Sequence, residues 1–187
     1  MRKLLLIPIV LVLAGCGGDK TLQPLSPGAV VLAFGDSLTF GTGTTRTNSY
    51  PSQLADMTGF NVINAGVPGE ISKRGVERLP GLLREHQPQL LILIHGGNDM
   101  LRRLGYGAAA DNLKAMIQMA RDDGVDVVML GVPNPGLVLS SADFYAEVAE
   151  EMNVPIDEDA IADILQYPSN KSGQVHPISL CIGMNLV

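Results

Sequence analysis

The sequence has few of the residues that mark a disulfide-stabilised or a nucleic-acid-binding protein. Among its 187 residues there are two cysteines, no tryptophan and 4% aromatic residues. The formal net charge is −6 and the lysines and arginines form no cluster, which argues against a nucleic acid or an anionic surface as a partner. With 46% hydrophobic residues, the composition and length predict one globular domain with its own core.

Hydrophobic runs are short, with one exception at the N-terminus. Arg2 and Lys3 precede an apolar run at residues 4–13, which has the length of a signal peptide and is too short to span a bilayer stably. The run ends in Leu13-Ala14-Gly15-Cys16, which resembles the lipobox of bacterial lipoproteins. We expect residues 1–15 to be a lipoprotein signal peptide and Cys16 to become a lipidated N-terminus. The alternative is a plain secretory signal with an incidental cysteine.

Lipidation of Cys16 has consequences for the rest of the chain. Cys181 is the only other cysteine, so no intramolecular disulfide is available and stability has to come from packing. By resemblance to sorting in enteric bacteria, Gly17 after the cysteine favours the outer membrane, facing the periplasm. Residues 16–28 then form a flexible tether between the anchor and a domain at residues 29–187.

Within that domain, short apolar runs alternate with longer amphipathic stretches. The runs are the predicted strands, at residues 29–34, 61–64, 90–94 and 125–130, with a weaker one at 154–156. The stretches carry apolar residues near helical spacing and are the predicted helices, at residues 50–58, 71–86, 108–123 and 142–152. This alternation predicts an α/β fold of three layers (α/β/α), a doubly wound parallel sheet with helices on both faces.

Residue types that do chemistry follow three of the predicted strands, and one more block comes late in the chain. The blocks are Gly35-Asp36-Ser37-Leu38, Asn64-Ala65-Gly66, Gly96-Gly97-Asn98-Asp99 and His176-Pro177. Ligands of doubly wound sheets bind at the carboxyl ends of the strands, where three of these blocks fall. A lone Gly-Asp-Ser is explained equally well as a turn, so the prediction depends on the combination.

In this order, over residues 30–177, the blocks resemble the GDSL, or SGNH, hydrolase family. The resemblance implies a flavodoxin-like sheet and the hydrolysis of carboxylic esters by a serine nucleophile. Segments 64–70 and 78–83 resemble the bacterial arylesterase, thioesterase and lysophospholipase branch of the family.

The resemblance also implies roles for individual residues. Ser37 is the expected nucleophile, and His176, in a loop after the last predicted helix, is the base that a serine hydroxyl needs at neutral pH. The expected oxyanion hole consists of the backbone N–H of Ser37, the backbone N–H of Gly66 and the side-chain amide of Asn98. Asp99 is expected to cap the turn that follows it.

The sequence departs from the family pattern in two places. The family usually carries an aspartate three residues before the histidine, where it orients the imidazole, and here that position is Gly173. Glycine leaves room for water or a backbone carbonyl to accept the same proton, so we expect a Ser-His dyad with slow but measurable hydrolysis. Residues 178–187 are shorter and more apolar than the family's closing helix, and we expect them to leave one face of the sheet partly uncovered.

Other kinds of site find less support in the sequence. Thr39 occupies the second glycine position of a G-x-S-x-G elbow, and no nucleotide-binding glycine motif follows the first predicted strand. His86, His95 and His176 lack partners at metal-ligand spacing, so neither a metal nor another cofactor is expected. We expect His86 to be solvated at a helix end and His95 to pack at a strand end, with substrate contact as the alternative for His95.

The predicted activity is hydrolysis of a carboxylic ester or thioester through an acyl-enzyme, with aryl esters, acyl esters and lysophospholipids as candidate small substrates. Residues 133–139 are a candidate apolar wall for an acyl chain. Two alternatives stay open: an O-acetyl esterase acting on envelope polysaccharide, and a catalytically impaired, lipid-anchored binding protein. The membrane partner is expected through Cys16, and the sequence identifies no protein partner.

Overall fold

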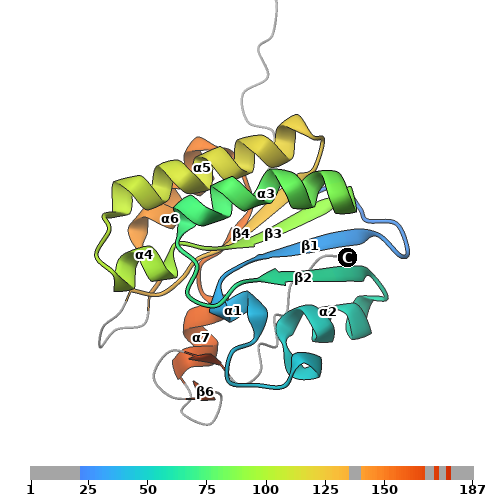
Figure 1. Cartoon of the computed structure of the whole chain (residues 1–187), viewed down its shortest axis with the longest axis horizontal. Coiled ribbons are helices and arrows are strands. Elements are labelled where there is room, and N and C mark those ends of the chain that lie inside the picture. The colour runs from blue at the N-terminus through green and yellow to red at the C-terminus, as the bar shows by residue number, and fades with distance from the viewer. Residues whose placement is uncertain (1–21, 135–139, 167–170, 173–175, 178–187) are drawn as a thin grey trace, which may run out of the picture.

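A five-stranded parallel sheet forms the centre of the molecule (Figure 1). The computed structural model describes residues 22–134, 140–166, 171–172 and 176–177. The sheet has the strand order β2-β1-β3-β4-β5. Its strands are β1 (Val30–Gly35), β2 (Asn61–Gly66), β3 (Leu90–Ile94), β4 (Asp126–Leu130) and β5 (Ile156–Asp157). The order reverses between β1 and β3, and this reversal is where doubly wound sheets bind their ligands.

Helices cover both faces of the sheet (Figure 1). One face carries α3 (Ser72–His86), α5 (Tyr106–Asp122) and α6 (Asp143–Glu151), and the other carries α1 (Ser37–Phe40), α2 (Tyr50–Thr58) and α7 (Ala160–Gln166). Short elements complete the described chain: α4 (Gly97–Leu101), a 3₁₀ turn η1 (Arg46–Asn48), β6 (Lys171–Ser172) and β7 (His176–Pro177). The predicted three-layer α/β/α fold with a flavodoxin-like sheet is confirmed.

The central strands are apolar because they are covered on both sides. All five residues of β3 are buried, and so are five of the six residues of β1. The edge strand β2 is mostly half-buried. Helix α5 buries Leu113, Met116, Ile117 and Ala120, which recur at helical spacing along one face of the helix.

Every predicted strand and helix is present, and α2 and β3 have the predicted bounds. The prediction that His176 lies in a loop is wrong: it belongs to β7, which pairs antiparallel with β6. Strands β6 and β7 consist of Lys171-Ser172 and His176-Pro177, which form no run of large apolar residues, so the sequence pattern carries no signal for them.

Several predictions concern residues outside the described part of the chain. These are the signal peptide at 1–15, the lipidation of Cys16, the role of Gly173 and the tail at 178–187. Within the described residues, no helix is both long enough and apolar enough to span a membrane.

Candidate active site

The candidate nucleophile lies at the exit of β1. Asp36 precedes α1 and caps it, because its Oδ1 accepts a hydrogen bond of 3.0 Å from the backbone N–H of Leu38. Ser37 is the first residue of α1 and is half-buried. At Gly35 a Cβ would lie 2.1 Å from the carbonyl oxygen of Ile94, so only glycine lets β1 turn into the helix this close to β3.

Gly66 ends the neighbouring strand β2 and supports α1 directly. A Cβ added to Gly66 would lie 2.1 Å from the backbone nitrogen of Phe40, so α1 packs on bare backbone at this point. The N–H of Gly66 donates to Oδ1 of Asn64 over 3.0 Å. This candidate oxyanion donor therefore already has an acceptor in the unliganded protein.

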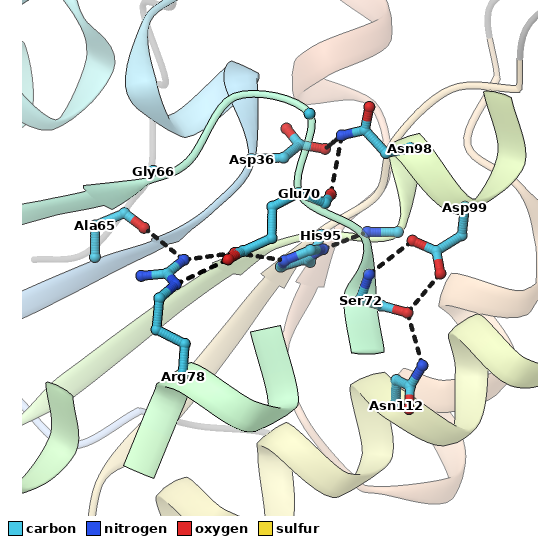
Figure 2. Close-up of polar contacts among 12 residues, drawn as sticks. Asp36, Ala65, Gly66, Glu70, Ser72, Arg78, His95, Asn98, Asp99 and Asn112 are labelled. Carbon is cyan, nitrogen blue, oxygen red and sulfur yellow. Dashed lines mark hydrogen bonds and ion pairs between the residues drawn. The ribbon is translucent and has the colours of Figure 1, made fainter. Parts of the chain in front are cut away.

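Asn98, at the start of α4 after β3, is tied to the nucleophile helix (Figure 2). Its Nδ2 donates to Oδ2 of Asp36 over 2.9 Å and to the backbone oxygen of Glu70 over 3.0 Å. Asp36 therefore bridges the first turn of α1 and the amide of Asn98, a role that the sequence analysis missed. The available signal was an aspartate directly before a helix start, the residue type preferred at that position.

His176 approaches this group through its backbone. Cα atoms of β7 lie within 8 Å of Cα atoms of α1, and β7 also adjoins α7. The structure therefore brings the ends of β1, β2 and β3 together with the β7 backbone, whereas the His176 side chain lies outside what it describes.

A buried polar network lies behind these groups (Figure 2). The guanidinium of Arg78 donates through Nε to Oε1 of Glu70 over 3.0 Å and through Nη2 to Oε2 over 2.6 Å. The guanidinium also stacks 4.3 Å from the centre of the Phe34 ring. Neither Arg78 nor Glu70 was assigned a role by the sequence, because two residues eight positions apart pair only once the β2–α3 loop is folded.

His95 completes this network from the end of β3. It is fully buried and its ring lies against Phe34, so the prediction of strand-end packing is confirmed. The backbone N–H of Gly96 donates to Nδ1 over 3.0 Å, so Nδ1 is the unprotonated nitrogen and Nε2 carries the hydrogen. Nε2 lies 3.2 Å from Oε2 of Glu70 and donates to it.

The Glu70 carboxyl is held ionised by this arrangement. Burial alone would raise its pKa, but the hydrogen bonds from His95 and Arg78, with the positive charge of Arg78, outweigh burial and hold the pKa below its ordinary value of 4.5. The pair is largely withdrawn from solvent, with side chains 7% exposed for Glu70 and 26% for Arg78. Glu70 is therefore charged throughout the neutral range.

Asp99 stabilises a different helix from the one predicted. Its Oδ2 accepts from the backbone N–H of Ser72 over 2.8 Å and its Oδ1 from the Ser72 hydroxyl over 2.7 Å. Ser72 begins α3, so Asp99 caps the N-terminus of that helix, where a negative charge is stabilising, and the prediction of a cap on the following turn is wrong. His86 lies in the last turn of the same helix and is half-buried. Among the described residues, no group of three or more His, Cys, Asp or Glu is arranged to hold a metal ion.

The order and spacing of these segments match a known family. Residues 33–178 match the sequence model of the GDSL-like lipase/acylhydrolase family. The chain belongs to this family. The resemblance to this family that the sequence analysis stated is confirmed.

Three curated relatives show where in the GDSL-like family the chain lies. It is 34% identical over 130 residues to esterase TesA of Pseudomonas aeruginosa, covering 67% of this chain and 65% of that esterase. It is 35% identical over 136 residues to an arylesterase of Vibrio mimicus, with coverages of 67% and 68%. It is 29% identical over 133 residues to thioesterase 1/protease 1/lysophospholipase L1 of Escherichia coli K12, with coverages of 67% and 64%. The chain thus spans about two thirds of the length of these relatives.

A solved structure of the GDSL-like family has the same architecture. AlinE4, an SGNH-hydrolase family esterase, superposes with a TM-score of 0.70 at 28% identity, covering 82% of this chain and 88% of AlinE4. The relatives' names agree with the predicted branch of arylesterases, thioesterases and lysophospholipases.

Proposed function

We propose that this chain hydrolyses carboxylic esters and thioesters through an acyl-enzyme formed on Ser37. The observation that carries the proposal is the meeting of the β1, β2 and β3 ends, which bear Ser37, Gly66 and Asn98, beside the backbone of β7. A serine hydroxyl needs a neighbouring base to act as a nucleophile, and His176 belongs to β7, the strand that adjoins α1.

In the proposed reaction, Ser37 Oγ attacks the ester carbonyl carbon and its proton passes to His176. The carbonyl oxygen becomes an oxyanion, stabilised by the N–H groups of Ser37 and Gly66 and by the amide of Asn98. As the carbon–oxygen bond to the alcohol breaks, or the carbon–sulfur bond to the thiol, His176 returns the proton to the leaving group. Water then attacks the acyl-enzyme by the same route and regenerates Ser37.

Two of these donors must exchange partners when the oxyanion forms. In the unliganded protein, Gly66 donates to Asn64, and both bonds of the Asn98 amide are made, to Asp36 and Glu70. A full negative charge is a stronger acceptor than the amide oxygen of Asn64 or the backbone oxygen of Glu70. The oxyanion therefore replaces these neutral acceptors, and the donors need little reorientation because they are already ordered.

The class of substrate is proposed from the surroundings of the site and from the relatives' names. Phe40 in α1, Val67 after β2 and Leu101 in α4 expose large apolar side chains, 41%, 38% and 50% respectively, on the segments that carry the site. Such side chains suit an acyl chain or an aryl group, and the relatives are named as an esterase, an arylesterase and a thioesterase/lysophospholipase. Residues 135–139 of the predicted acyl wall at 133–139 lie outside the described chain.

The test is steady-state hydrolysis of p-nitrophenyl esters of increasing acyl length, lysophosphatidylcholine and an acetylated glycan. We expect turnover of the acyl esters by the native chain and its loss in Ser37→Ala, with an unchanged melting temperature. Undiminished turnover by Ser37→Ala would remove Ser37 as the nucleophile. Turnover confined to the glycan would favour the O-acetyl esterase, and no turnover at all would favour the binding protein that Gly173 suggests.

We also propose that the domain is anchored to the bacterial outer membrane, facing the periplasm, through a lipidated Cys16. The proposal is supported by the apolar run at residues 4–13 and the Leu13-Ala14-Gly15-Cys16 segment. Each buried methylene of an acyl chain contributes about 0.8 kcal/mol to membrane binding, so several chains on one cysteine give stable attachment. Expressed in a Gram-negative bacterium, the native chain should fractionate with outer membranes and Cys16→Ser should not. Equal fractionation of both would contradict the anchor.

A further inference from the structure

One peptide unit of the site is held at both of its polar ends. The carbonyl oxygen of Ala65 accepts a hydrogen bond of 3.0 Å from Nη2 of Arg78 (Figure 2). The N–H of Gly66 donates to Oδ1 of Asn64. These two groups belong to the same peptide bond, the one between Ala65 and Gly66. Because that bond is planar, a contact that fixes the carbonyl also fixes the direction of the N–H.

Arg78 is itself held rigidly. Two hydrogen bonds to Glu70 hold one edge of its guanidinium, the Phe34 ring packs against its face, and His95 holds Glu70 from the other side. A guanidinium offers such a planar fork of donors, whereas a lysine ammonium does not. The position of the positive charge relative to the Ala65 carbonyl is thus set by the fold.

We infer that Arg78 is a positioning residue of the oxyanion hole, acting through the Ala65–Gly66 peptide. Its charge draws electron density toward the Ala65 oxygen, which makes the Gly66 N–H a stronger donor, and its hydrogen bond aims that N–H. The inference rests on the proposed function, because it takes Gly66 as an oxyanion donor.

Glu70 also contacts the second oxyanion donor, Asn98. Its carboxylate holds Arg78, and its backbone oxygen accepts from Nδ2 of Asn98. One residue of the β2–α3 loop thus connects Gly66 and Asn98, which approach the oxyanion from different strands.

Helix α3 offers a matched control. Arg74 lies one turn before Arg78 and forms an ion pair of 2.6 Å with Glu77, but those side chains are 71% and 50% exposed. Among the described residues, the Arg74 guanidinium donates to Glu77 and makes no hydrogen bond to a backbone group. Replacing it removes an arginine and an ion pair from the same helix and leaves the Ala65–Gly66 peptide untouched.

The kinetic test compares Arg78→Met, Arg78→Lys and Arg74→Met on a p-nitrophenyl ester. Removal of a whole oxyanion donor costs about 10²–10³ in kcat, so loss of its orientation and polarisation by Arg78→Met should cost about 10–100-fold, with KM nearly unchanged. Arg78→Lys should recover part of the loss because it restores a charge, and Arg74→Met should behave like the native chain. An unchanged kcat in Arg78→Met, or a loss carried by KM, overturns the inference.

A second readout does not depend on turnover. In proton–nitrogen NMR spectra, the Gly66 amide proton should move upfield in Arg78→Met and less so in Arg78→Lys, while that of Gly81 in α3 stays in place. An unmoved Gly66 resonance overturns the inference even if kcat falls, because the loss is then merely structural. Hydrolysis that persists in Ser37→Ala would contradict the proposed function. The NMR measurement would still test whether Arg78 polarises the Ala65–Gly66 peptide. If Arg78→Met does not fold because Glu70 is left unpaired, Arg78→Met/Glu70→Gln removes that charge and takes its place.

Discussion

At the scale of single residues, the site depends on side chains that pair across distant parts of the chain. Asp36 joins Asn98, which is 62 positions away, and His95 joins Glu70, 25 positions away. Such pairs take buried groups out of water together, which is tolerable only because each charge or polar atom meets a partner. The consequence is a set of groups with fixed orientations around the candidate nucleophile.

The charge of Glu70 makes stability depend on pH in a defined direction. The pKa of Glu70 is lower in the folded protein than its ordinary value of 4.5. The ionised carboxylate therefore contributes fully to the free energy of unfolding above about pH 4.5, and this contribution is lost as the pH falls through the pKa of the folded state. Glu70→Gln should therefore lower the free energy of unfolding by about 2 kcal/mol at pH 7, the scale of hydrogen bonds to a charged group. The difference from the native chain should shrink steadily below pH 4.5.

Urea denaturation at pH 7, 5, 4 and 3 measures this difference. Arg78 and His95, the charged or titratable groups that face Glu70, are present in both proteins. Glu77→Gln serves as the control, because its pair with Arg74 is exposed to solvent and should contribute little to stability. A Glu70→Gln deficit that stays constant from pH 7 to pH 3 would contradict the ionised pair.

The sequence predicted the residues at strand ends better than their partners. The positions of Ser37, Gly66 and Asn98 follow from locating three buried strands, since each comes at or just after a strand end. Asp36, Glu70 and Arg78 were missed because pairing between side chains leaves no period in a sequence. Asp99 was assigned a cap on its own turn because a local partner is the only kind a linear pattern suggests.

At the scale of secondary-structure elements, a close backbone contact between α1 and β2 holds together two parts of the candidate active site. Gly66 lets the backbone of Phe40 approach to a distance that no side chain would allow. This packs the end of α1 on the end of β2, and the pairing of Gly35 with Gly66 in the sheet places the start of α1 at the same edge as Gly66.

Adding one methyl group at Gly66 should disrupt this contact. Because the nearest atoms all belong to the backbone, neither element can yield by a rotamer change, and Gly66→Ala should destabilise the protein by about 3 kcal/mol, the upper end of the usual cost of overpacking. Gly81→Ala is the matched control, since a Cβ there meets nothing within 4 Å and alanine in place of an exposed helical glycine stabilises by about 0.5–1 kcal/mol. Thermal unfolding of both variants and of the native chain measures these differences in stability. A Gly66→Ala protein as stable as the native chain would contradict the close packing of α1 on β2.

Elements were predictable from the sequence in proportion to their length. Helix α2 and strand β3 have enough residues to display a period, and both were located with their observed bounds. Helix α7, of seven residues, and the two-residue strands β6 and β7 were not predicted. Helix α7 begins at a cap, since Oδ1 of Asp157 accepts a hydrogen bond of 2.9 Å from the backbone N–H of Ala160. It also buries Ile161, Ala162 and Leu165, and tertiary packing stabilises so short a helix more than its intrinsic propensity does.

At the scale of the whole molecule, the topology brings the two ends of the domain together. The first strand lies inside the sheet, between β2 and β3 and beside the reversal point, and β7, near the end of the described chain, returns to lie against α1. A sequence shows that a serine comes early and a histidine late, but only the fold shows that α1 and β7, the elements that carry them, lie side by side. The resemblance to the GDSL-like family supplied that expectation before the fold was described.

The missing aspartate at position 173 gives a prediction for the complete protein. The family carries an aspartate there to orient the imidazole, so Gly173→Asp should raise kcat by at least about tenfold, a fraction of the roughly 10⁴-fold effect of the corresponding aspartate in other serine hydrolases. Gln174→Asp, one position later, is the control and should not help. Equal kcat in the native chain and Gly173→Asp would mean that another group orients His176.

The central claim is that Ser37 is a nucleophile activated by His176, and covalent labelling tests it most directly. The folded protein is treated with a fluorophosphonate, and the modified residue is located by mass spectrometry of its peptides, in the native chain and in His176→Ala. We expect a single phosphonyl adduct on Ser37 in the native chain, formed at least about 100-fold more slowly in His176→Ala because the base contributes about 10²–10⁴-fold. An adduct on another residue, or equal labelling rates in the two proteins, would contradict the mechanism.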